Sequence, residues 1–104
     1  MTRKSLLTGL KPMHPGELLR EDILPAIGKP KTEIAELLGI GRQTLYDILN
    51  ERKPVTVQMA FRLGKLIGNG PEFWLNLQRR YDLAIAEKEM APEVAKIPTL
   101  HEAA

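Results

Sequence analysis

The chain has 104 residues, of which 43% are hydrophobic and 27% are charged, a composition that fits one domain with a modest core. It contains no cysteine and only two histidines, far apart in the sequence, which excludes disulfides and thiolate metal sites and argues against a zinc site. Residues 1–70 carry 11 Lys/Arg against 7 Asp/Glu, whereas residues 71–104 carry 4 against 6. The basic first part indicates a polyanionic partner, and the acidic remainder indicates a different one.

The two ends of the chain differ in composition from its middle. Residues 1–13 are basic and lack the apolar stretch of a secretory signal, so they are expected to form a flexible arm of a cytoplasmic protein. The apolar runs are too short to span a membrane. Residues 89–104 contain Pro92 and Pro98 and are predicted to form a loosely ordered tail. Residues 14–88 are expected to form the folded domain.

Helical periodicity dominates residues 14–88, and no segment alternates long enough to predict a strand. The first of five expected helices begins at Pro15 and is limited by Pro25 and Gly28. The second covers about residues 31–38 and the third about residues 42–49.

The last two helices are expected after a turn that Pro54 closes. Thr56 is the predicted N-cap of the fourth helix, which ends at Gly68. The fifth begins at Pro71, and its buried face is predicted to be Phe73, Trp74, Leu77, Tyr81, Ala84 and Ile85. The predicted fold class is therefore all-α.

The most informative segment runs from residue 31 to residue 50. Its small and apolar residues have the spacing of a helix-turn-helix, in which two short helices are held at a fixed angle. These residues are Ile34, Ala35, Leu38, Gly39, Ile40, Leu45 and Ile48. Gly39 suits a sharp turn with positive φ. The outer face of the second helix of the motif then carries Arg42, Gln43, Tyr46 and Asp47.

These outer residues suit the reading of DNA bases in the major groove. Arginine pairs with guanine and glutamine with adenine, and Tyr46 can reach a phosphate or a thymine methyl group. Thr44 and the backbone at Gly41 can hold a phosphate, and the two cations that follow the helix are placed for neighbouring phosphates. The predicted DNA-contacting residues are Lys31, Arg42, Gln43, Thr44, Tyr46, Asn50, Arg52 and Lys53.

Other polar residues are interpreted as structural. His14 is expected to cap or pack, and Glu17 and Arg62 are expected to form a partly buried pair. The chain lacks a nucleophile elbow and a phosphate-binding loop, and its single serine, Ser5, lies in the arm. We therefore expect neither an enzyme nor a cofactor.

Several motifs together resemble the HigA-type antitoxins of the Xre/Cro-like helix-turn-helix family. They are His14-Pro15-Gly16-Glu17-Leu18-Leu19, the segment 35–50, Thr56–Leu63, Pro71-Glu72-Phe73-Trp74-Leu75-Asn76-Leu77-Gln78 and Tyr81-Asp82-Leu83. The resemblance covers about residues 14–83. It implies a five-helix, lambda-repressor-like DNA-binding domain. It also implies a homodimer that represses its own operon at a palindromic operator. The expected protein partner is a HigB-type toxin, a ribosome-dependent mRNA-cleaving protein encoded beside it.

Three residues depart from the common pattern of that family. Lys31 stands where many members have Gln, Gly41 stands where Ser or Thr usually caps the helix, and Glu51 replaces a frequent Gly. Two alternatives therefore stay open. One is a free-standing phage-type repressor, and the other is a protein-interaction module whose helix-turn-helix is vestigial.

Overall fold

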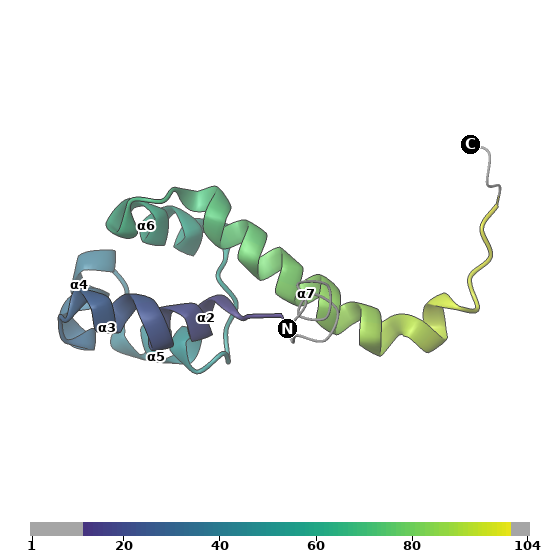
Figure 1. Ribbon diagram of the computed structural model, residues 1–104, viewed down its shortest axis with the longest axis horizontal. Helices are drawn as coiled ribbons and strands as arrows, with labels where there is room; N and C mark the ends of the chain where they lie inside the picture. Colours follow the sequence, from purple (N-terminus) through teal and green to yellow (C-terminus); the bar gives the residue numbers. More distant parts are fainter. Residues whose placement is uncertain (1–11, 101–104) are drawn as a thin grey trace, which may run out of the picture.

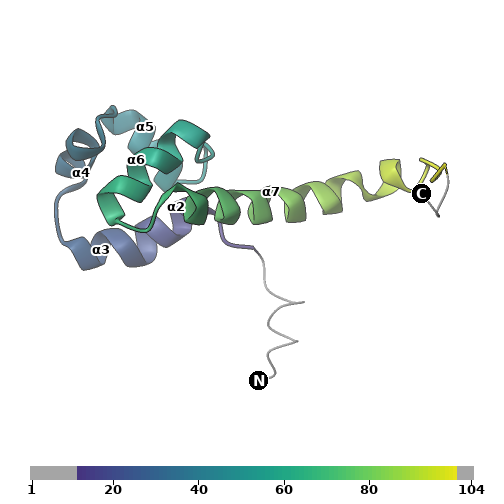
Figure 2. The same cartoon turned by 90° about the horizontal axis from the view of Figure 1, so that it is seen from above.

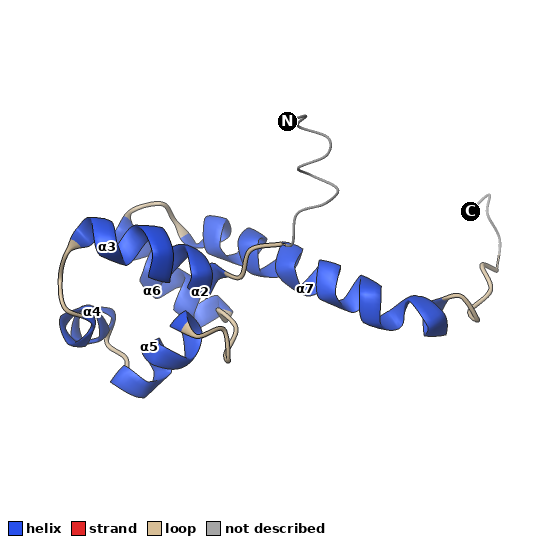
Figure 3. Ribbon diagram, turned by 60° about the horizontal axis from the view of Figure 1, so that its bottom comes forward, coloured by secondary structure: helices blue, strands red, loops and turns tan. Residues whose placement is uncertain are grey.

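The computed structural model describes residues 12–100, and within them every regular element is helical (Figure 3). The expected arm of residues 1–13 lies almost wholly outside this range. The helices α2 to α6 gather at one end, and α7 runs away from them (Figure 1). In the described part of the chain, no helix is long and apolar enough to cross a membrane.

The first helical rod consists of α2 (Pro15–Leu18), the π-helical turn η1 (Leu19–Ile23) and α3 (Leu24–Ile27). Pro25 therefore lies inside the rod instead of limiting it. The backbone N–H of Leu24 donates to the carbonyl of Leu19, five residues back, and this wider turn directly precedes the proline, which has no N–H to place. Gly28, with φ of 78°, ends the rod as expected.

The helix-turn-helix consists of α4 (Lys31–Leu38) and α5 (Arg42–Leu49), with the predicted boundaries. Gly39 has φ of 74°, and the N–H of Ile40 donates to the carbonyl of Ala35 across the turn. Arg62 does not pair with Glu17. Its Nη1 donates instead to the carbonyls of Leu38, at 2.7 Å, and Gly39, at 3.4 Å, which caps α4.

The helix α6 (Val57–Ile67) begins and ends as predicted. The Thr56 hydroxyl accepts from the N–H of Met59 at 3.2 Å, and Gly68 adopts a left-handed conformation. Among the described residues, the buried apolar core consists of Leu19, Leu24, Ile34, Ala35, Leu38, Leu45, Ile48, Leu49, Val55, Met59, Ala60, Leu63 and Trp74. All five rods contribute to this core.

The helix α7 (Pro71–Val94) departs from the sequence prediction in two ways. Trp74 is buried, but Phe73 is 43% exposed, and Gln78 is buried in its place on the inner face. The helix also passes the boundary expected at residue 88 and contains Pro92. Residues 86–94 are exposed, and most of them have high helix propensity, so one missing N–H does not end the helix.

Because α7 continues beyond the body, the molecule is elongated, with extents of 52, 34 and 23 Å. The final turns of α7 stand clear of the other helices in both orthogonal views (Figures 1 and 2).

His14 joins the start of the first rod to α7. Its Nδ1 accepts from the N–H of Gly16 at 2.9 Å, and its ring meets the edge of Tyr81 with centroids 4.9 Å apart. The predicted capping role is confirmed. Burial lowers the pKa of His14 below its ordinary 6.5, although the carboxylates of Glu51 and Asp82 act in the opposite direction.

The lowered pKa of His14 predicts a loss of stability in weak acid. The unfolded histidine gains a proton near pH 6.5 while the folded one stays neutral, so the free energy of unfolding falls as the pH drops below that value. We expect the urea midpoint to be lower at about pH 5.5 than at about pH 7.5. In His14→Asn, whose side chain does not titrate, this decrease should be smaller. Equal decreases in both chains would contradict the prediction.

Candidate nucleic-acid interface

The helix α5 presents the predicted base-reading residues on one exposed surface. Leu45, Ile48 and Leu49 are buried, which turns Arg42 and Gln43 outward into solvent. Thr44 and Tyr46 are half-buried at the edges of this surface. The N-cap is Gly41, which offers no side chain to the first N–H groups of α5. The start of the helix therefore carries donors suited to an anion.

The other predicted contacts flank the same surface. Lys31 is exposed at the start of α4, and Asn50, Arg52 and Lys53 are exposed just beyond α5. The turn after α5 folds back, since the N–H groups of Arg52 and Lys53 donate to the backbone carbonyl of Asp47 at 2.7 and 3.2 Å. This turn places both cations beside the helix.

Asp47 is the polar centre of this surface, a role that the sequence did not indicate. Its Oδ1 accepts from Gln43 Nε2 at 2.9 Å and from Arg52 Nη2 at 3.1 Å, and its Oδ2 lies 3.6 Å from Lys53 Nζ. The hydrogen bond from Gln43, followed by that from Arg52, holds the pKa of the Asp47 carboxyl below its ordinary value. The carboxylate is therefore ionised at neutral pH.

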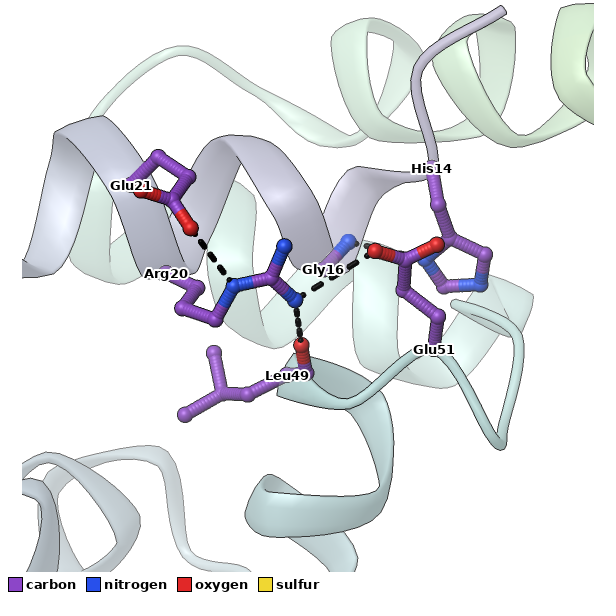
Figure 4. Close-up of polar contacts among 6 residues, drawn as sticks. All are labelled: His14, Gly16, Arg20, Glu21, Leu49 and Glu51. Atoms are coloured by element: carbon purple, nitrogen blue, oxygen red, sulfur yellow. Dashed lines mark hydrogen bonds and ion pairs between the residues drawn. The ribbon is translucent and has the colours of Figure 1, made fainter.

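The first rod holds the other end of α5 (Figure 4). Arg20 donates through Nη1 to the carbonyl of Leu49 at 2.5 Å and to the carboxylate of Glu51 at 3.3 Å, and through Nε to Glu21 at 2.8 Å. Gly16 lies against the carbonyl of Ile48. Carbonyls of the last turn of a helix lack partners within the helix, so these contacts both satisfy and fix the end of α5.

Glu51 explains one departure from the family pattern. It has φ of 62°, the left-handed conformation that glycine adopts at little cost. The Arg20 guanidinium approaches its carboxylate, but both side chains are about one-third exposed. Such a pair stabilises the chain by only about 0.2–1 kcal/mol, so it offsets only part of the backbone strain.

Replacing Glu51 with glycine should therefore stabilise the fold. Relief of the left-handed strain, about 1–2 kcal/mol, exceeds the loss of the exposed ion pair. We expect the free energy of unfolding to rise by about 0.5–1 kcal/mol, measured by urea denaturation. Glu51→Gln keeps the strained side chain and loses the pair, so it should be slightly destabilising. A Glu51→Gly chain no more stable than Glu51→Gln would contradict this account.

The fold and this surface together define a helix-turn-helix protein. Residues 19–75 match the family described as Helix-turn-helix. Antitoxin HigA-1 of Vibrio cholerae is 36% identical over 76 residues, which cover 73% of this chain and 71% of that protein. The chain therefore belongs to the Xre-type helix-turn-helix family and, within it, to the HigA-type antitoxins. Membership of this family agrees with the expectation that the chain is not an enzyme.

Solved structures support the same assignment. The structure of antitoxin GraA has a TM-score of 0.83 and 40% identity, and the similarity covers 88% of this chain and 100% of that one. The Pseudomonas aeruginosa antitoxin HigA, solved with the higBA promoter, has a TM-score of 0.81 and 33% identity, with coverage of 86% and 99%. The expected lambda-repressor-like, five-helix fold is confirmed.

Proposed function

We propose that this chain is the antitoxin of a type II toxin–antitoxin module and represses its own operon by binding an operator sequence in the cytoplasm. The observation that carries the proposal is the exposed pair Arg42 and Gln43 on the first turn of α5. The buried side of the same helix fixes the direction of this pair. The start of the second helix of the motif is the part that enters the major groove.

The DNA contacts divide into two kinds. Arg42 and Gln43 read bases, with Tyr46 beside them, whereas Thr44, Lys31, Asn50, Arg52 and Lys53 contact the backbone. One helix reads only a few base pairs. We therefore propose a symmetric homodimer on a palindrome, with half-sites about 34–36 Å apart or a multiple of that distance.

The toxin belongs to the same proposal. Family membership supports a partner of the HigB type, an mRNA-cleaving protein encoded in the neighbouring reading frame. Co-expression should yield a complex of the two chains, in which the toxin no longer cleaves mRNA. A chain that binds its operator but does not bind the neighbouring product would instead be a free-standing repressor.

Fluorescence anisotropy with the DNA upstream of its own gene tests the DNA-binding proposal. Wild-type chain should bind this duplex more tightly than a scrambled one, and Arg42→Ala/Gln43→Ala should abolish the difference. Gln43→Ala alone should cost about 1–3 kcal/mol at one base pair. Lys53→Ala should weaken binding to both duplexes equally and reduce the salt slope by about 0.9. A folded wild-type chain without preference would favour the protein-interaction alternative.

A further inference from the structure

Asp47 places a carboxylate in the middle of a surface proposed to face a polyanion. Its side chain is 15% exposed, whereas those of its partners Arg52 and Lys53 are 59% and 53% exposed. A negative charge at this position repels phosphates, so its presence calls for a compensating role. The two cations offset that repulsion, and the shortest contact that Asp47 makes through its side chain is with Gln43, at 2.9 Å.

The charge of Asp47 determines which end of the Gln43 amide faces it. An ionised carboxylate only accepts hydrogen bonds, so the amide nitrogen must point toward Asp47 and the amide oxygen away from it. One N–H of Gln43 is then used within the protein. The side chain keeps one N–H donor and its carbonyl acceptor for DNA.

This remaining pair of groups complements a single base. Adenine offers an acceptor, N7, and a donor, the N6 amino group, in the major groove, whereas guanine offers two acceptors there. The free N–H of Gln43 can donate to N7 while its oxygen accepts from N6. Without Asp47 the amide can rotate about its last bond and present either end to either base. The bond between Asp47 and Gln43 thus reduces the freedom that would allow other bases to bind.

We propose that Asp47 is a specificity-determining positioning residue, which fixes the Gln43 amide in the orientation that selects adenine and lowers affinity for DNA in general. This inference rests on the proposed DNA-binding function. It predicts that removing Asp47 changes two quantities in opposite directions. Preference for adenine falls because Gln43 is released, and affinity for unrelated DNA rises because a negative charge is lost and Arg52 and Lys53 become free to contact phosphates.

A selected duplex provides the probe. Wild-type chain selects a sequence from a pool of random duplexes, and anisotropy then measures its affinity for that duplex, for each single-base-pair change and for a scrambled duplex. The position at which Gln43→Ala loses discrimination marks the base that Gln43 reads. We expect adenine there, preferred by about tenfold or more in the wild-type chain.

In Asp47→Ala, this preference should fall to about threefold or less while affinity for the scrambled duplex rises. Asp47→Asn, whose amide oxygen can accept the same bond, should retain most of the preference. Glu51→Gln is the matched control, because it removes another exposed carboxylate near the end of α5 that bonds to Arg20 instead of Gln43. It should raise affinity for both duplexes and leave the preference unchanged.

Three outcomes would overturn the inference alone: a base other than adenine at the Gln43 position, wild-type preference in Asp47→Ala, or the same change of preference in Asp47→Ala and Glu51→Gln. A purely structural role of Asp47 would lower thermal stability without changing the preference. Failure of the wild-type chain to select any sequence would overturn the proposed function itself, so the two failures are distinguishable.

Discussion

Gly16→Ala is expected to lower the free energy of unfolding by about 3 kcal/mol. A Cβ atom on Gly16 would overlap the carbonyl oxygen of Ile48 and lie 2.9 Å from its carbonyl carbon. The obstacle is backbone at the end of α5, so no side chain can rotate to make room. The substituted chain must separate α2 from α5, and this movement also disturbs the hydrogen bond between Gly16 and His14.

Urea denaturation of Gly16→Ala and of Gly41→Ala provides the comparison. Gly41 is an N-cap with negative φ, and a Cβ placed there meets no atom within 4 Å, so its replacement should cost only a few tenths of a kcal/mol. The shift of α5 should also weaken operator binding by Gly16→Ala under conditions in which the chain is still folded. Equal urea midpoints for the two variants would contradict the packing argument.

The boundaries of α4 and α5 were predictable because local signals coincide there. Gly39 adopts the predicted positive φ, and the apolar spacing matches the buried face. The prolines were misleading for the opposite reason. Pro25 and Pro92 remove one N–H each, but a π-helical turn before the first and an exposed helix around the second accommodate that loss. A residue-by-residue interpretation overestimates such breaks.

The burial of Gln78 depends on a distant segment and could not be predicted from periodicity. Its Oε1 accepts from the N–H of Val55 at 2.7 Å, and its Nε2 donates to Asp82 at 2.9 Å. Both ends of the amide are therefore bonded, which makes its burial favourable. Phe73, one helical position from Trp74, faces outward because the inner face of α7 is occupied by Trp74 and Gln78.

For the candidate interface, the sequence identified which residues face outward but not how they are connected. The outward direction of Arg42 and Gln43 follows from helical periodicity alone. The contacts of Asp47 depend on the turn after α5, where Glu51 adopts a left-handed conformation and brings Arg52 back beside the helix. A departure from the expected glycine at residue 51 was visible in the sequence, whereas the backbone conformation that makes it costly was not.

Trp74→Ala is the other substitution with a large expected effect, a loss of about 3–5 kcal/mol. Trp74 has no exposed surface, and its indole N–H donates to the side chain of Asn69 at 2.9 Å. Its removal leaves a cavity between α7 and the helices of the body. Because small domains are stable by only about 5–15 kcal/mol, a measurable fraction of the chain should unfold even without denaturant.

Trp74→Phe separates the two contributions of the indole. Phenylalanine keeps most of the buried aromatic surface and loses the hydrogen bond, and Asn69 is exposed, so water can replace the missing donor. We expect a loss of about 1–2 kcal/mol, measured by the urea midpoint and slope. Equal losses for the two variants would mean that the hydrogen bond, and not the packing, attaches α7 to the body. The proposed helix-turn-helix function would then depend on a single polar contact outside the motif.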